Sequence, residues 1–271
     1  MGDLPMSTTT VNKNLTRASQ CFGWAVRNGY MASNPAENVT LSDNRKAYEQ
    51  RQIFTVDNLK SLFHSLEYVE DDFRFSYQFW LPVIGLFTGM RIEEICQLHL
   101  EDIRLEQGIW VFDLFEKRED KRKTAAGQRY IPLHEFLIQD LNLPGRVQYL
   151  QDAGYARLFP ELDRDKKYGK FSLRAGKWFN ERFKRKCGIT DKGKAFHSFR
   201  HTFINHLKQQ GADPIVMQEL GGHEFQGETL SRYSKKFEPA PLYERGIKFI
   251  DYEGLGLDLS HLVRSKFVQG K

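Results

Sequence analysis

Six residues stand in an order that suits attack on a phosphodiester without a metal ion. They comprise one tyrosine, two arginines, one lysine and two histidines, and in chain order they are Arg91, Lys123, His197, Arg200, His223 and Tyr233. A phosphodiester is negatively charged, and attack at phosphorus adds charge to its two non-bridging oxygens. Arginine suits these oxygens because its planar fork donates two parallel hydrogen bonds and keeps its charge. Arg91 and Arg200 are therefore the candidates for holding the phosphate.

Tyr233 is the candidate nucleophile. A phenol has a pKa of about 10 in water, so it needs a base or strongly positive surroundings to attack at neutral pH. His197 is the candidate to take that proton or to hold a phosphate oxygen, and His223 is the candidate to donate to a phosphate oxygen. Lys123 is the candidate to protonate the leaving 5′ oxygen, and general acid catalysis is typically worth ~10²–10⁴ in rate. The product would be a phosphotyrosine ester that stores the bond energy, so we expect neither a metal ion nor another cofactor.

Each of these residues also has a simpler explanation when it is taken alone. The chain has 11 tyrosines, most of which must be structural, and a His-x-x-Arg pair often arises by chance. Arg91 and Glu94 would more often be a surface ion pair worth less than ~1 kcal/mol. Lys123 lies within a cluster of basic residues, and His223 follows two glycines as a loop histidine would. Only the ordered set favours catalysis.

A zinc site is an alternative of a different class. His197 and His201 are four residues apart, which is the spacing of a zinc-binding pair, and His223 would be a third ligand. The stretch lacks the glutamate that a zinc protease places after its first histidine. Arg200 between the two histidines would also repel a cation. We therefore expect no metal in the site and catalysis that is insensitive to a chelator.

The two arginines are expected to lie at one end of two helices. Arg200 follows His197 by three residues, so both are predicted on the polar side of a helix over 197–209, together with His201. The apolar side of that helix carries Phe199, Phe203 and Leu207. Arg91 is predicted at a helix start after the turn Thr88-Gly89, which ends a buried helix over 73–87. Glu94, one turn on, is close enough to orient Arg91 or a nearby histidine.

The remaining elements are mostly helical. Apolar spacing predicts a helix over 11–30 and another that begins after Thr55 as its N-cap. Residues 109–115 and 129–133 read as paired strands on either side of the charged loop that holds Lys123. Asp213-Pro214 starts a helix that stops at Gly221-Gly222. Further helices are expected near 134–142, 146–153, 172–187 and 230–235.

Basic residues are concentrated in one part of the chain. The net charge is +5, yet the segment from Arg164 to Lys194 holds twelve Lys or Arg residues against three acids, with aromatic residues interleaved. Such a face suits a polyanion, although a charged run is more often a solvated helix face. Because the candidate chemistry also points to nucleic acid, we expect DNA contacts from Lys166, Lys167, Lys170, Arg174, Lys177, Lys184 and Arg185.

Composition limits the class of protein. The chain has 271 residues, of which 40% are hydrophobic and 28% charged, as in ordinary globular proteins. No apolar run approaches the ~20 residues that span a bilayer, and no secretory signal is visible. Cys21, Cys96 and Cys187 are far apart, which supports neither a disulfide framework nor a zinc–cysteine site. A reducing cytoplasm is therefore the default, and we expect no membrane partner.

Four motifs together resemble the catalytic domain of the phage integrase family, the tyrosine recombinases. They are Thr88-Gly89-Met90-Arg91-Ile92-Glu93-Glu94, the stretch from Lys123 to His134 with Ile131-Pro132-Leu133, His197-Ser198-Phe199-Arg200-His201, and Glu219-Leu220-Gly221-Gly222-His223 followed by Arg232-Tyr233. The resemblance covers about residues 53–236. It implies a mainly α fold with a small antiparallel β-sheet. It also implies cleavage and rejoining of double-stranded DNA attachment sites through a 3′-phosphotyrosyl intermediate, by a tetramer on DNA that is a monomer or weak oligomer without it.

The resemblance predicts three parts of the chain. Residues 1–45 would be a remnant of a helical core-binding domain with a linker, residues 46–238 the catalytic domain, and residues 239–271 a tail. The tail carries apolar residues that would dock on this molecule or on a neighbouring protomer. We expect a truncated integrase with weak, strongly salt-dependent DNA binding. A topoisomerase with the same tyrosine chemistry and a DNA-binding protein without enzyme activity are the alternatives.

Overall fold

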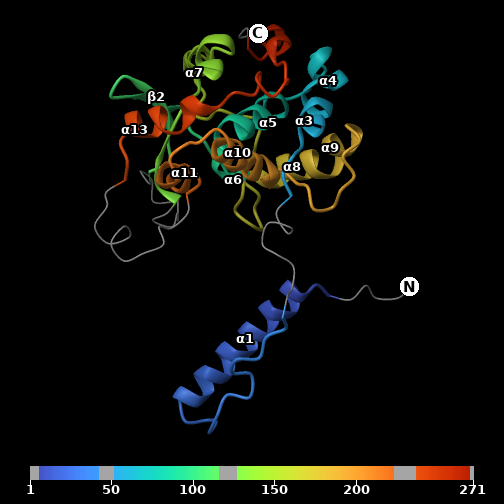
Figure 1. The fold of residues 1–271 in the computed structure, drawn as a ribbon, viewed down its shortest axis with the longest axis vertical. Helices are drawn as coiled ribbons and strands as arrows, with labels where there is room; N and C mark the ends of the chain where they lie inside the picture. Colours follow the sequence, from blue (N-terminus) through green and yellow to red (C-terminus); the bar gives the residue numbers. More distant parts are fainter. Residues whose placement is uncertain (1–5, 43–51, 116–126, 223–235, 269–271) are drawn as a thin grey trace. The chain divides into compact units, whose positions relative to one another are not determined.

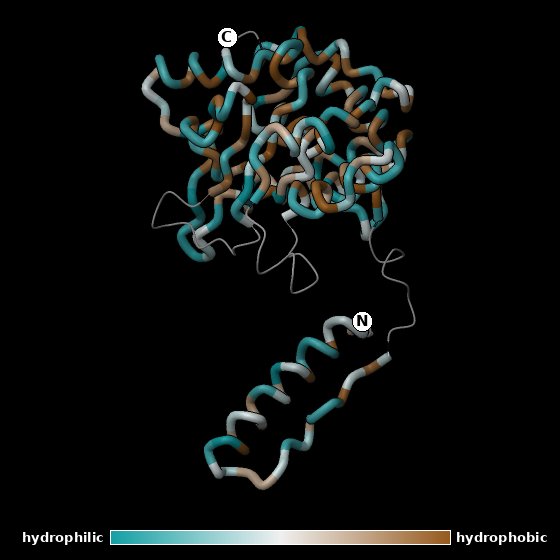
Figure 2. The backbone as a smooth tube through the Cα atoms, turned by 60° about the vertical axis from the view of Figure 1, so that its left-hand side comes forward, coloured by the Kyte–Doolittle hydropathy of each residue, from teal (hydrophilic) through white to brown (hydrophobic). Residues whose placement is uncertain are grey.

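The computed structural model describes residues 6–42, 52–115, 127–222 and 236–268. The chain divides into two compact units, residues 1–50 and 51–271. The first unit consists of helix α1 (Thr8–Arg27) and a following segment that runs back along it. Ser7 caps the helix, and Asn12 exchanges two hydrogen bonds with the backbone of Leu41. None of the residues of α1 is buried, and Figure 2 shows it as largely hydrophilic.

Within its described residues, the second unit is mainly α with a small antiparallel sheet, as expected. Its strands are β1 (Ile103–Glu106), β2 (Ile109–Asp113) and β3 (Tyr130–Pro132). Its short non-α helices are the 3-10 turns Leu100–Asp102, Ile247–Phe249 and Ser260–Arg264 and the π-helical turns Phe136–Asp140 and Trp178–Phe183. The α-helices are α3 (Val56–Phe63), α4 (Leu66–Val69), α5 (Ser76–Thr88), α6 (Ile92–Cys96), α7 (Leu143–Asp152), α8 (Ser172–Lys177), α9 (Lys184–Lys186), α10 (His197–Gln209), α11 (Pro214–Leu220) and α13 (Pro239–Glu244).

Helices α5 and α10 pack against each other in the middle of the second unit (Figure 1). The close approach depends on Gly85, because a Cβ there would lie 2.8 Å from the ring of Phe196. From α10, Phe199, Phe203 and Leu207 are buried as predicted. Helix α5 ends at Gly89, whose φ of 60° is the left-handed conformation that glycine adopts without strain. This turn brings the start of α6 beside the middle of α10.

Local sequence signals account for several boundaries. Thr55 caps α3 and forms a capping box with Asn58, and Asp213 accepts from the amide of Ile215 at the start of α11. The predicted strand pair is confirmed, since β2 pairs with β3 in antiparallel fashion. Strand β1 was not predicted. It joins β2 through Gln107 and Gly108, whose φ angles of 50° and 81° match a two-residue hairpin turn.

The described part of the tail, residues 239–268, packs into the core of the second unit. Leu242, Ile247 and Leu262 are buried there, and Trp80 of α5 donates its indole N–H to the carbonyl of Phe267 at 3.3 Å. The sequence leaves open whether the tail docks on its own molecule, and these contacts are intramolecular. Among the described residues, no helix is both long enough and apolar enough to cross a membrane.

Two neutral histidines form hydrogen bonds with the tail. Because they can be protonated, the stability of the folded protein depends on pH. The amide of Asp251 donates to Nε2 of His206 at 3.0 Å, and His134 binds the carbonyl of Ile250 through Nε2 at 3.1 Å while Nδ1 accepts from the amide of Phe136. Burial lowers the pKa of His206 although Asp251 opposes it, and burial likewise lowers the pKa of His134. Protonation of His206 would remove the acceptor for the Asp251 amide and weaken the attachment of the tail, whereas protonation of His134 would remove the acceptor for the Phe136 amide.

We expect the free energy of unfolding to fall as the pH drops below about 6.5, the pKa of an unfolded histidine. Below that pH the unfolded chain binds protons that the folded chain does not. Each histidine therefore lowers the free energy of unfolding by up to about 1.4 kcal/mol for each unit by which the pH falls. Urea unfolding between pH 7.5 and 5.5 measures this slope. His206→Gln, whose amide oxygen can still accept from Asp251, should reduce the slope. Equal slopes in the two proteins would contradict the assignment.

Candidate active site

Arg91 stands at the N-cap of α6, where its side chain is 43% exposed and directed by Glu94. The backbone N–H of Arg91 donates to Oε2 of Glu94 at 2.9 Å, and its Nη1 donates to Oε1 at 3.0 Å. Its Nη2 donates to the carbonyl of Gly222 at 3.3 Å. Of the two partners expected for Glu94, Arg91 or a nearby histidine, Arg91 is the one paired here, and the pair joins α6 to the turn that follows α11.

Arg200 is buried rather than lying on the solvent side of α10. It is only 2% exposed, whereas His197 is exposed and His201 partly so, and their rings meet edge to face at 4.7 Å. The expected polar stripe is therefore wrong for Arg200. The reason is the turn after α5, which covers this part of α10 and offers the carbonyl of Gly89 to Nη1 of Arg200 at 3.0 Å. Helical spacing alone cannot reveal such a covering segment.

The guanidinium of Arg200 is suited to an anion. Its Nη2 is buried and has no hydrogen-bond partner among the described residues. Burial, together with the neighbouring Arg91 and Arg129, lowers the pKa of Arg200 to about 9, and Glu94 only partly opposes them. Three guanidinium groups and one carboxylate leave two positive charges uncompensated within this cluster. An anion bound there would stabilise the charged form of Arg200 and satisfy its free N–H groups.

Arg129 belongs to this cluster, although sequence analysis gave it no role. Its side chain is fully buried and donates to both oxygens of Glu94, at 3.3 and 3.2 Å. Burial alone would raise the pKa of Glu94, but Arg129 and then Arg91 lower it to about 2, so the carboxylate stays ionised. The signal in the sequence is an arginine at the start of a strand whose following residues are apolar or aromatic.

Three predicted site residues, Lys123, His223 and Tyr233, lie outside the described residues. The structure does describe residues that flank them. Gly127 and Gly222 are buried beside the arginine cluster, where their carbonyls accept from Arg129 and Arg91. Of the six candidate catalytic residues, the structure thus places Arg91, His197 and Arg200. It brings the two arginines together with Glu94.

Of the seven basic residues expected to contact DNA, all but one are exposed. Lys184 is 5% exposed, and its Nζ donates to the carbonyls of Asp191 and Lys194. It was expected on the basic face but instead ties down the loop after α9, and burial lowers its pKa. The exposed members are Lys166, Lys167, Lys170, Arg174, Lys177 and Arg185. Arg174 also lies over the ring of Phe75 at 4.3 Å.

Two other features bear on the candidate chemistry. In the described ranges, no group of three or more His, Cys, Asp or Glu side chains is placed to hold a metal ion. The third ligand of the zinc alternative, His223, is not in those ranges. A pocket of about 400 Å³ lies between the end of α5, the π-helical turn Phe136–Asp140 and the tail.

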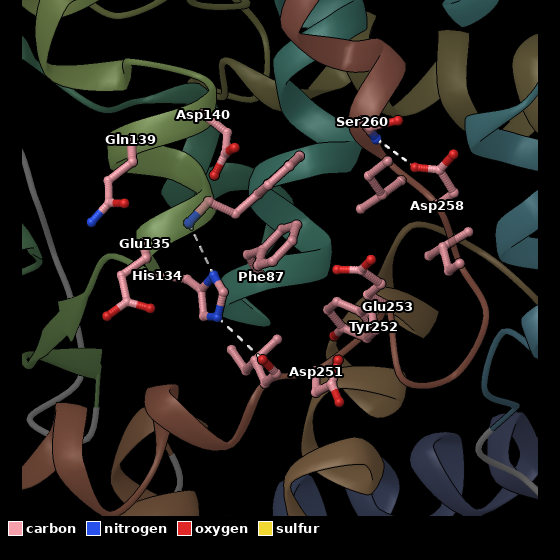
Figure 3. A pocket seen from close by; sticks show the side chains of 14 residues that line it. Phe87, His134, Glu135, Gln139, Asp140, Asp251, Tyr252, Glu253, Asp258 and Ser260 are labelled. Carbon is pink, nitrogen blue, oxygen red and sulfur yellow. Dashed lines mark hydrogen bonds between the residues drawn. The ribbon is translucent and has the colours of Figure 1, made fainter.

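That pocket is chemically unlike a phosphate site. Figure 3 shows carboxylates on both of its sides, from Glu135, Asp140, Asp251, Glu253 and Asp258. Lys and Arg are absent from the described residues that line it, and so are the candidate catalytic residues. Because carboxylates repel phosphate, the arginine cluster is the better anion site.

Comparison with known proteins agrees with the fold and the motifs. The Phage integrase family matches residues 52–238. Tyrosine recombinase XerC of Thermodesulfovibrio yellowstonii is 28% identical over 228 residues, which cover 80% of this chain and 68% of the relative. Tyrosine recombinase XerD of Staphylococcus epidermidis strain RP62A is 26% identical over 225 residues, covering 82% and 70%.

Two solved structures share the fold. The Tn1549 transposon integrase in complex with transposon right end DNA has a TM-score of 0.56 at 22% identity, with 86% of this chain and 76% of that chain covered. The lambda integrase dimer bound to a COC′ core site has a TM-score of 0.55 at 15% identity, with 85% and 76% covered. Since the family match spans more than half of the sequence, the chain belongs to the phage integrase family and contains a tyrosine recombinase catalytic domain.

Proposed function

We propose that this protein is a site-specific recombinase of a mobile element, which cleaves and rejoins DNA through a covalent 3′-phosphotyrosyl intermediate. The observation that carries the proposal is the convergence of half-exposed Arg91 and buried Arg200, whose Nη2 has no partner among the described residues. Family membership supports a tyrosine nucleophile. The transposon integrase among the similar folds supports a mobile element, and we propose a tetramer on paired DNA sites as the active assembly.

The chemistry follows from the charges. Arg91 and Arg200 would hold the two non-bridging oxygens of the scissile phosphate, whose charge increases during attack. The Tyr233 oxygen attacks phosphorus while His197 takes its proton or holds a phosphate oxygen. The bond from phosphorus to the 5′ oxygen breaks, and Lys123 protonates that oxygen. His223 donates to the phosphate. A 5′-hydroxyl of the partner strand then attacks phosphorus and releases Tyr233, so no external energy source is consumed.

Covalent trapping tests this proposal. A library of nicked duplexes is incubated with the full chain, and DNA that remains bound after denaturation is recovered and sequenced. We expect a protease-sensitive adduct on a preferred sequence, formed equally well with a chelator present. Tyr233→Phe should form none, because it removes the attacking oxygen. The exposed Tyr155 supplies the control, since Tyr155→Phe should behave as wild type.

The trapping result also separates the alternatives. An adduct that survives Tyr233→Phe would show that another residue attacks and would overturn the assignment. No adduct under any condition would favour the DNA-binding protein without enzyme activity. Cleavage of the DNA without any covalent adduct, abolished by a chelator, would favour a zinc hydrolase that uses His197, His201 and His223.

We propose that the exposed basic face around α8 binds the DNA backbone. Changing Lys166, Lys167 and Lys170 to glutamine should weaken binding and reduce the slope of log affinity against log salt by ~0.9 for each phosphate that is no longer neutralised. Lys248 is a suitable control, because it is exposed and already pairs with Glu244 at 2.9 Å. Fluorescence anisotropy over a salt series measures both slopes. An unchanged slope in the triple variant would show that these three lysines do not neutralise DNA phosphates.

A further inference from the structure

Arg129 connects three separate segments through one buried guanidinium group. Its Nε donates to the carbonyl of Leu220 at 2.9 Å, and its Nη1 donates to the carbonyl of Gly127 at 3.0 Å. Its Nη1 and Nη2 also reach the two oxygens of Glu94. The segments joined are the start of α6, the end of α11 and the chain before β3. The first of these segments carries Arg91, the second precedes His223, and the third follows Lys123.

Glu94 links Arg129 to Arg91 through hydrogen bonds. Its carboxylate accepts two hydrogen bonds from Arg91 and two from Arg129, so it lies between the two guanidinium groups. Arg91 and Arg129 also hold the same turn, through the carbonyls of Gly222 and Leu220. The direction of the half-exposed Arg91 side chain is thus fixed by contacts that Arg129 makes beneath it.

A structural role alone does not account for this arrangement. A buried charge carries a large desolvation cost, and apolar residues of similar volume often replace buried ion pairs without loss of stability. Arg129 instead keeps a buried carboxylate ionised at the point where that carboxylate directs a phosphate-binding arginine. Such orientation matters for catalysis because a misplacement of about 1 Å can lower a rate ~10²-fold.

We propose that Arg129 is a positioning residue for DNA cleavage, which orients Arg91 through Glu94 and fixes the turn at Leu220–Gly222. The inference rests on the proposed function and deepens it. Arg129 does not touch the phosphate. Its effect on the reaction passes through Glu94, so the two residues act as one unit.

The first test compares cleavage by folded variants in single-turnover reactions with the trapped duplex. Arg129→Gln should lower the rate of adduct formation ~10²-fold at saturating protein. Glu94→Gln should lower it similarly, and the double variant should be little slower than either single variant. The matched control is Arg146→Gln, because Arg146 is also a buried arginine and its described hydrogen bond and ring contact go to Phe267 and Trp80 rather than to Glu94. Arg146→Gln should leave the rate of adduct formation unchanged.

The second test follows the protonation of Glu94 and does not depend on activity. In Arg129→Gln the buried carboxylate loses its main partner, so its titration, followed by the ¹³C shift of the carboxyl carbon, should move upward from that of wild type. The rate of adduct formation should then also depend on the protonation of Glu94, which stays ionised in wild type. Arg129→Lys keeps a positive charge and should restore the wild-type titration while leaving the rate low. This variant also serves if Arg129→Gln does not fold.

The outcomes are distinct. A wild-type rate in Arg129→Lys, or a wild-type rate with an unchanged Glu94 titration in Arg129→Gln, would overturn the inference while Tyr233-dependent trapping continued to support the proposed function. Additive effects of Arg129→Gln and Glu94→Gln would also overturn it, because they would show independent roles. Absence of any Tyr233-dependent adduct in wild type would instead remove the proposed function.

Discussion

Arg200→Met is expected to abolish cleavage while leaving the protein at least as stable as wild type. The rate of adduct formation should fall ~10³-fold, as it does when a preorganised charge-stabilising donor is removed from an active site. The guanidinium is buried, its Nη2 has no partner in the described part of the chain, and two further arginines lower its pKa. A group held in this way is arranged for a ligand rather than for the stability of the folded protein.

Stability should therefore change in the opposite direction to activity. Methionine fills similar space without an unsatisfied donor, and a buried donor without a partner disfavours the folded state by about 1–3 kcal/mol. We expect the urea midpoint of Arg200→Met to equal or exceed that of wild type. Arg200→Lys should stay charged but lose the planar fork, and it should also be slow. A variant that is clearly less stable, or one that cleaves at the wild-type rate, would contradict this account.

The sequence predicts the segments of the site better than the directions of its side chains. Motif spacing places Arg91 and Glu94 at a helix start, and the structure pairs them at 3.0 Å. It also places Arg200 on the polar side of α10, opposite the buried apolar side, but the structure buries Arg200 as well. Residues three apart share one side of a helix whatever covers that side. The covering turn at Gly89 comes from a segment more than one hundred residues earlier, which local periodicity does not register.

Lys184 and Arg129 show the same limit. Lys184 lies in a strongly basic stretch, but the loop through Asp191 and Lys194 folds back and supplies carbonyls to its ammonium group. Arg129 is predicted only as part of a strand, and its partners lie 35 and 91 residues away in sequence, at Glu94 and Leu220. Charge and propensity are local properties, whereas burial of a charged group depends on which distant carbonyls and carboxylates surround it.

Strand β1 was missed for a different reason. It has four residues, of which Arg104 and Glu106 are charged, and only Ile103 is buried. A strand so short has too little alternation to be distinguished from a loop. Its pairing is instead favoured by the hairpin turn at Gln107-Gly108, because both positions adopt positive φ.

Gly89→Ala should damage both stability and cleavage, because three features meet at this one residue. Its φ of 60° disfavours any side chain by about 1–2 kcal/mol. A Cβ would also lie 2.6 Å from Cδ1 of Phe203, a fully buried ring that packing leaves little room to move. Overpacking of this kind typically destabilises by about 1–3 kcal/mol. Finally, the Gly89 carbonyl holds Nη1 of Arg200, so a shifted turn moves the phosphate-binding group.

Gly108→Ala separates these effects. Gly108 has a comparable φ of 81°, but nothing lies within 4 Å of the Cβ that alanine would add. Gly108→Ala therefore carries only the cost of a side chain at positive φ. We expect Gly89→Ala to lose more free energy of unfolding than Gly108→Ala in urea titration. Under conditions where both remain folded, only Gly89→Ala should form the covalent adduct slowly. Equal losses of stability in the two variants would mean that the turn at Gly89 tolerates the added methyl group. A rate of adduct formation that stays at the wild-type value in both would mean that Arg200 does not depend on the Gly89 carbonyl for its position.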